Sequence, residues 1–154
     1  MQSRINPYTT APDTMKAMLD LEAHVKNMSL EHSLIELVKT RASQINGCAF
    51  CLHMHTKDAR AAGETEARLY LLNAWRESRL YTARERAALE WTEALTLVAE
   101  THAPDEVYDA VKAQFQPKEI VELTLLISTI NAWNRFAIGF RSVHPEDAKN
   151  AAAA

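Results

Sequence analysis

The chain contains few of the residues that interrupt helices or cross-link chains. Its 154 residues include three glycines, five prolines and two cysteines. Two cysteines cannot form the disulfide scaffold that stabilises many small secreted domains. Scarce glycine and proline, without strand-like alternation between turn signals, argue against a β fold. Long stretches rich in Ala, Leu, Glu and Arg instead predict an all-α chain.

The chain also lacks a strong net charge and a long apolar run. Its formal net charge is -3, and Lys and Arg are scattered, so we expect neither nucleic acid nor a membrane as a partner. No run is long enough to span a bilayer, and no N-terminal stretch resembles a signal peptide. With 47% hydrophobic and 24% charged residues, the sequence predicts a single cytoplasmic globular domain.

Turn signals divide this domain, residues 12–141, into about seven expected helices. An extended arm (1–11), with Pro7 as a breaker, precedes it, and a polar tail (142–154) that we expect to fray follows. Thr82 and Glu85 form a capping box, and Gly47 suits the left-handed position after a helix. The expected helices cover about 13–27, 30–45, 48–63, 65–75, 82–101, a segment from 104, and 117–140.

The expected helix 117–140 is apolar on nearly all sides, which indicates a central helix, a subunit interface or both. In a chain of this size we favour both, and we therefore expect a homo-oligomer. Asn131 and Asn134 interrupt its apolar surface. Buried amides need hydrogen-bond partners, so we interpret them as ties between helices, with donation near a cleft as the alternative. The apolar residues are Ile120, Val121, Leu123, Leu125, Leu126, Ile127, Ile130, Trp133, Phe136 and Ile138.

Both cysteines lie in one short segment, at positions 48 and 51, and His55 follows four residues later. On a helix these spacings place Cys48, Cys51 and His55 on one face. A helix N-terminus and a neighbouring histidine both lower the pKa of a thiol, and the thiolate is the reactive form. The segment therefore predicts a reactive dithiol with its own proton acceptor.

Two arguments disagree on which cysteine attacks a substrate. The helix dipole favours Cys48, which is nearer the helix start, whereas the spacing to His55 favours Cys51. Because both cysteines lie in the first turn and a specific base discriminates more sharply, we predict Cys51 as the nucleophile and Cys48 as the resolving thiol.

A zinc site is the main structural alternative, and simple burial of two small thiols is the other. Zinc usually takes four ligands, and only Cys48, Cys51 and His55 converge in the sequence. Nothing in the spacing of the remaining histidines indicates a fourth ligand. We therefore expect neither a metal nor another cofactor. Those histidines are His24, His32, His102 and His144.

A longer pattern, Glu-x11-Cys-x2-Cys-x3-His, is matched by Glu36, Cys48, Cys51 and His55. With this pattern and the strings 41–51 and 130–135, the sequence resembles the alkylhydroperoxidase D family of the carboxymuconolactone decarboxylase superfamily. The resemblance extends over about residues 30–141. It implies an all-α fold that assembles into trimers or hexamers and reduces hydroperoxides without a cofactor.

The resemblance also implies a role for each residue of the pattern. Cys51 attacks the peroxide, Cys48 closes a disulfide, and Glu36 and His55 relay protons. An external dithiol, either thioredoxin-like or a lipoyl carrier, then reduces the disulfide. Without the resemblance Glu36 would be read as a solvated carboxylate, opposite the apolar face of its helix. Phe50 stands where the best-known member has a further histidine.

Two other functions remain open from the sequence. One is a decarboxylase-type lyase, as other members of the superfamily are, although that chemistry does not require a C-x-x-C pair. The other is a regulatory module that uses the dithiol as a redox sensor or to hold a metal.

Overall fold

The computed structural model describes the backbone of residues 2–152 and the side chains of residues 2–149, and its elements over that range are all helical. The all-α prediction is confirmed. None of these helices is both long and apolar enough to cross a membrane. The elements are α1 (Pro7–Thr10), α2 (Pro12–Lys26), α3 (His32–Asn46), α4 (Ala49–Ala61), α5 (Glu66–Tyr70), the 3-10 helix η1 (Leu72–Ala74), α6 (Ala83–Thr96), α7 (Val98–Thr101), α8 (Asp105–Lys112), α9 (Pro117–Phe140) and α10 (Pro145–Ala152).

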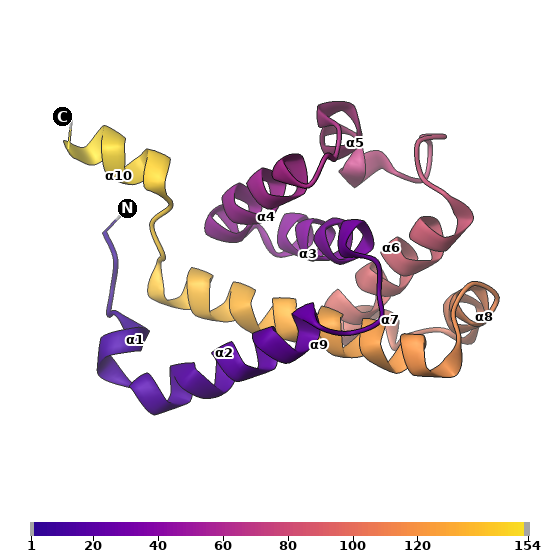
Figure 1. Cartoon of the computed structure of the whole chain (residues 1–154), viewed down its shortest axis with the longest axis horizontal. Coiled ribbons are helices and arrows are strands. Elements are labelled where there is room, and N and C mark those ends of the chain that lie inside the picture. The colour runs from indigo at the N-terminus through magenta and orange to yellow at the C-terminus, as the bar shows by residue number, and fades with distance from the viewer. Residues whose placement is uncertain (1, 153–154) are drawn as a thin grey trace.

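Helix α3 lies at the centre and packs against α4, α6 and α9 (Figure 1). Its side chains are buried on several sides, including Leu34, Leu37 and Val38. The largest core cluster joins α3 to α6 and α9. Members of this cluster include Leu34, Ile35 and Val38 of α3, Ala88 and Trp91 of α6, and Leu123, Leu126 and Ile127 of α9.

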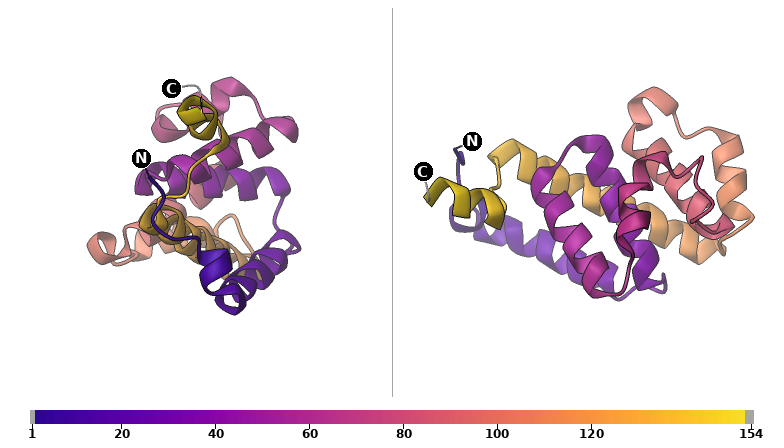
Figure 2. Two further views of the ribbon diagram at one scale, coloured as in Figure 1. Left: turned by 90° about the vertical axis from the view of Figure 1, so that its left-hand side faces the viewer. Right: turned by 90° about the horizontal axis from the view of Figure 1, so that it is seen from above.

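Helix α9 is the long helix that the sequence predicted, and its bounds agree with that prediction. Helix α2 packs along it, and the N-terminal segment and α10 lie at the same end of the molecule (Figures 1 and 2). The backbone N–H of Arg4 donates to the carbonyl of Phe140 at 3.1 Å. Buried Lys39 of α3 pairs with Glu22 of α2, which also accepts a hydrogen bond from Trp133 of α9.

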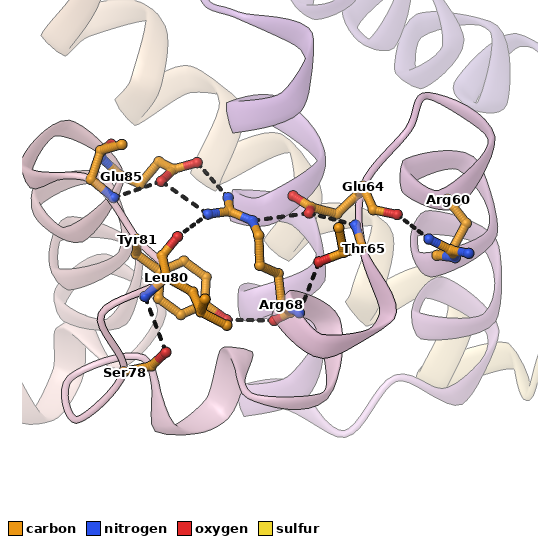
Figure 3. Close-up of polar contacts among 9 residues, drawn as sticks. Arg60, Glu64, Thr65, Arg68, Ser78, Leu80, Tyr81 and Glu85 are labelled. Atoms are coloured by element: carbon orange, nitrogen blue, oxygen red, sulfur yellow. Dashed lines mark hydrogen bonds and ion pairs between the residues drawn. The ribbon is translucent and has the colours of Figure 1, made fainter.

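The segment after α4 is held by an arginine that lies between two acidic residues (Figure 3). The Arg68 guanidinium donates to Glu64 at 2.9 Å and to Glu85 at 2.5 Å. Glu85 also forms the predicted capping box of α6 with Thr82. Arg68 therefore connects the end of α4, α5 and the start of α6 in one network.

Three local expectations were wrong. The expected helix 65–75 is divided into α5 and the 3-10 helix η1. Pro7 does not break the chain: it is the first residue of α1, capped by the side chain of Asn6. The expected helix 82–101 ends at Thr96 and restarts as α7, and the Thr101 hydroxyl donates to the carbonyl of Ala94 near the break.

The C-terminal tail is helical from Pro145 to Ala152, with proline at its start and Glu146 and Asp147 in the first turn. Fraying of the tail stays a prediction, and the last two alanines of the tail lie outside the described residues.

Candidate active site

The connection between α3 and α4 places the two cysteines. Gly47 ends α3 with a left-handed backbone, φ 68° and ψ 34°, which glycine adopts with little strain. Cys48 is the N-cap of α4, and its Sγ accepts a hydrogen bond from the backbone N–H of Cys51 at 3.4 Å. The backbone N–H of Cys48 itself donates to the carbonyl of Ser43 at 3.0 Å. The turn therefore fixes Cys48 directly at the positive end of the α4 dipole.

The two cysteine sulfurs contact each other and are buried by neighbouring side chains. Both cysteines are free thiols, 1% and 2% exposed, and their Sγ atoms are 2.6 Å apart. Cys48, Cys51 and Ala137 of α9 form a small cluster on which Phe50 packs. The two sulfurs can therefore form a disulfide with little movement of the backbone.

The contact between the two thiols shifts their pKa values in opposite directions. The pKa of Cys48 is lowered to about 7, chiefly because Cys51 hydrogen bonds to its sulfur, against the opposing effect of burial. The pKa of Cys51 is raised by the hydrogen bond to Cys48, by burial and by the charge on Cys48. The thiolate therefore forms more readily on Cys48 than on Cys51, and Cys51 retains its proton.

A buried carboxylate–imidazole pair lies on the same two helices. Glu36 Oε2 of α3 and His55 Nδ1 of α4 are 3.0 Å apart, and each residue is 5% exposed. Burial alone would raise the pKa of Glu36, but the hydrogen bond to His55 and the charges of His55 and Lys39 lower it. Glu36 is therefore a carboxylate at neutral pH, and it forms a hydrogen bond with Nδ1 of the His55 ring.

The position of Glu36 differs from the one its helical periodicity indicates. Glu36 lies away from the strongest apolar stripe of α3, which is typical of a solvated residue. It is buried because α3 is central: α4 covers the face that would otherwise be exposed to solvent. Only the family pattern identified Glu36 from the sequence.

A small cavity lies beside Glu36. A cavity of about 150 Å³ is bounded by Glu36 and by residues of α3, α4 and the loop after α4. Neither cysteine lines it. Its lining residues are His32, Ser33, Glu36, Ala59, Ala62, Gly63 and Glu64.

The structure thus brings Cys48 to Cys51 and Glu36 to His55. Cys51 and His55 are one turn apart and are both buried on α4. Among residues 2–149, no direct hydrogen bond joins His55 to either sulfur. A proton that passes between the two pairs therefore needs a substrate, a water molecule or a side-chain rotation as a bridge.

The residues that could bind a metal in the structure differ from those considered from the sequence. The potential ligand atoms of Glu36, His55 and Asp58 lie within 4.8 Å of one another, so these three side chains form the group that could hold a cation. The set considered from the sequence was Cys48, Cys51 and His55.

Asn134 of α9 lies near the site, and the sequence analysis interpreted it as a tie between helices, with hydrogen-bond donation near a cleft as the alternative. Asn134 lowers the pKa of both cysteine thiols. The only signal in the sequence was a polar residue repeated, as Asn131 and Asn134, in an otherwise apolar helix.

Fold and site together define an all-α protein with a buried dithiol beside a carboxylate–imidazole pair. Residues 12–94 match the carboxymuconolactone decarboxylase family. The chain belongs to this family, as an AhpD-like member of the superfamily. Over 138 residues it is 46% identical to the uncharacterized protein YdfG of Bacillus subtilis (strain 168), covering 90% of this chain and 94% of that protein.

Two solved structures share the fold. An Agrobacterium tumefaciens protein of unknown function, whose name proposes a role in antioxidant defence as AhpD, is 49% identical. The likeness covers 94% of this chain and 99% of that one, with a TM-score of 0.92. The debrominase Bmp8 is 18% identical, with a TM-score of 0.77 over 88% of this chain and 73% of that one. At that identity the likeness shows the fold alone.

Proposed function

We propose that the chain is a cofactor-free thiol peroxidase that reduces hydroperoxides through a Cys48–Cys51 dithiol/disulfide cycle. The observation that carries the proposal is the contact of two buried free sulfurs, 2.6 Å apart, at a helix N-terminus. Family membership supports it, because the antioxidant role named for the Agrobacterium tumefaciens relative is the role such a pair would serve.

The cycle has three steps. The thiolate of Cys51 attacks the O–O bond of the hydroperoxide, which gives an alcohol and a sulfenic acid on Cys51. The sulfur of Cys48 then displaces hydroxide from that sulfenic acid, so that a disulfide forms and water is released. An external dithiol reduces this disulfide by thiol–disulfide exchange and is itself oxidised to a disulfide.

The hydrogen bond between the two thiols favours ionisation of Cys48 in the resting protein. Attack on the peroxide requires ionisation of Cys51 instead. Transfer of the Cys51 proton to Cys48 makes Cys51 the nucleophile, and Cys48 passes this proton on through His55 before it attacks the sulfenic acid. His55 then protonates the departing alkoxide, while Glu36 stabilises the imidazolium through its 3.0 Å contact. The cavity beside Glu36 supplies the path by which the relay exchanges protons with solvent.

Peroxide consumption by cysteine variants tests the cycle. With cumene hydroperoxide and dithiothreitol, Cys51→Ser should abolish turnover. Cys48→Ser should accumulate a sulfenic acid on Cys51, detected by dimedone labelling and peptide mass spectrometry. If dimedone instead labels Cys48 in the Cys51→Ser variant and Cys51 stays unlabelled in Cys48→Ser, the two roles are reversed.

A histidine pair on α4 provides a matched test of the relay. His55→Ala should lower turnover by about 100-fold, the usual size of a general acid–base contribution. His53→Ala is the control, because the His53 ring stacks on His144, with ring centroids 5.2 Å apart, outside the dithiol site. Equal losses in the two variants would contradict the relay.

Two alternatives each have one observation in their favour. The family name supports decarboxylation of a lactone acid. A variant that lacks both cysteines would still catalyse this reaction. The grouping of Glu36, His55 and Asp58 supports a cation site, which stoichiometric zinc in the purified protein would establish. If the variant without cysteines retains lyase turnover, the decarboxylase is favoured over the peroxidase.

A further inference from the structure

One buried hydroxyl of helix α3 has no hydrogen-bond partner. Thr40 is 0% exposed, and among residues 2–149 its Oγ1 is the only buried side-chain oxygen or nitrogen that makes no hydrogen bond. Leaving such a group unpaired is costly, because folding removes it from water without replacing the hydrogen bonds that it made there. The proposed cycle gives Thr40 no role.

The Thr40 hydroxyl also differs from those of other helical threonines in the chain. A threonine within a helix can donate to the carbonyl four residues earlier, which satisfies its hydroxyl inside the helix. Thr40 makes no such bond to the carbonyl of Glu36. Its hydroxyl is therefore free for a ligand. The threonines that do donate to this carbonyl, at 2.7 to 2.8 Å, are Thr56, Thr92, Thr124 and Thr129.

The position of Thr40 on α3 places it against α4, which packs along α3 (Figure 1). Residues three and four apart share one face of a helix, so Glu36, Thr40 and Ser43 lie on the same face. One turn before Thr40, Glu36 contacts His55 of α4. One turn after it, the carbonyl of Ser43 accepts the backbone N–H of Cys48. Thr40 therefore lies opposite the stretch of α4 between the dithiol and the imidazole.

An open cavity borders this level of the two helices. Its volume is about 550 Å³, and its lining includes the residues that directly follow Thr40 and Cys51 in the chain. Thr40 and Cys51 themselves do not line it. The cavity therefore gives a hydroperoxide an approach to this level from solvent. Its lining residues are Arg41, Gln44, Leu52, Tyr70 and Asn73.

We propose that Thr40 is a substrate-binding residue, whose hydroxyl donates a hydrogen bond to the hydroperoxide oxygen that leaves as the alcohol. This role rests on the proposed peroxidase function. When the Cys51 sulfur bonds to one peroxide oxygen, the O–O bond breaks and its electron pair stays on the leaving oxygen. A donor beside that oxygen stabilises the developing charge and holds the oxygen for protonation by His55. Thr40 keeps its own proton throughout.

Thr40→Val removes the hydroxyl and keeps the shape of the side chain. With cumene hydroperoxide and dithiothreitol, kcat/KM should fall by about tenfold to 100-fold, as expected for a lost hydrogen bond to an oxygen that becomes charged. Thr40→Ser retains a hydroxyl and should keep most of the wild-type rate. Thr92→Val is the matched control and should keep that rate too, because Thr92 is equally buried but its hydroxyl donates to the carbonyl of Ala88.

Thiol alkylation by iodoacetamide separates a loss of substrate binding from damage to the dithiol. Thr40→Val should be alkylated at the wild-type rate across the pH range, and its thermal unfolding midpoint should equal or exceed that of the wild type, since the lost hydroxyl has no partner. Thr40→Ala provides the same comparison if the valine variant does not fold.

Three results would overturn the role of Thr40 while the peroxidase stands. They are wild-type kcat/KM in Thr40→Val, an equal loss in Thr92→Val, and a slowing of alkylation that matches the loss of turnover. Absent hydroperoxide turnover by the wild type is a different result, because it would refute the peroxidase and the role of Thr40 together.

Discussion

At the scale of single residues, the contact between Glu36 and His55 couples the site to pH. The folded protein lowers the pKa of Glu36 below its ordinary value of 4.5. The ionised carboxylate therefore adds stability above that ordinary pKa, and this contribution is lost as the pH falls through the lower pKa of the folded state.

Urea unfolding of Glu36→Gln at several pH values measures this contribution. The variant should be less stable than the wild type at pH 7, and the gap should narrow as the pH falls below about 4.5. Glu66→Gln, on the exposed side of α5, is the control and should follow the wild type at both ends of the range. A gap that stays constant with pH would show that Glu36 is not held as a carboxylate.

The sequence predicts which side chains lie together only where they belong to the same helix. The spacing of Cys48 and Cys51 predicted the contact of their sulfurs because both residues lie at the start of one helix, whereas His55 contacts Glu36. Glu36 and Asn134 come from other helices, and their burial depends on how α4 and α9 pack around α3. Periodicity along one helix contains no information on that packing.

At the scale of elements, the turn before α4 depends on one glycine. Gly47 has φ +68°, and an added Cβ would meet no atom within 4 Å, so the cost of Gly47→Ala is that of the backbone alone. We expect a loss of about 1 kcal/mol in unfolding free energy. Gly139→Ala in α9 also meets no atom within 4 Å and lacks the positive φ. It should be neutral or stabilising, and the reverse order would contradict this account.

A second prediction at this scale concerns the Arg68 network. Arg68→Ala leaves the largely buried carboxylates of Glu64 and Glu85 without their partner, and should cost about 2–3 kcal/mol. Arg60→Ala removes a more exposed arginine from the same region and should cost less than about 1 kcal/mol. Thermal unfolding followed by circular dichroism compares the two variants, and equal losses would argue against a special role for Arg68.

Helix boundaries could be predicted where a single residue determines them. Gly47, the Thr82–Glu85 capping box and Pro117 act through their own backbone or hydrogen-bonding groups, and each marks a boundary in the structure. The break between α6 and α7 has no such residue. It follows a local change of backbone at Leu97, and propensity gives no reason to expect it there.

At the scale of the whole molecule, α9 retains apolar side chains that the single chain does not cover. Val121 is 69% exposed, although other apolar residues of α9 form the core. Ile138 is also exposed. These side chains support the proposed homo-oligomer, because association would remove them from water.

Light scattering after size exclusion tests this assembly. We expect a mass three or six times the 17.3 kDa of one chain. A single species at the mass of one chain, across the concentrations used for activity assays, would contradict a homo-oligomer.

The central claim, that Cys48 and Cys51 form a redox cycle, is tested most directly by counting free thiols before and after one equivalent of cumene hydroperoxide. The account predicts that the two thiols of each chain fall to none, with a peptide linking Cys48 to Cys51, and that dithiothreitol restores both. Two free thiols remaining after the hydroperoxide is added would contradict it.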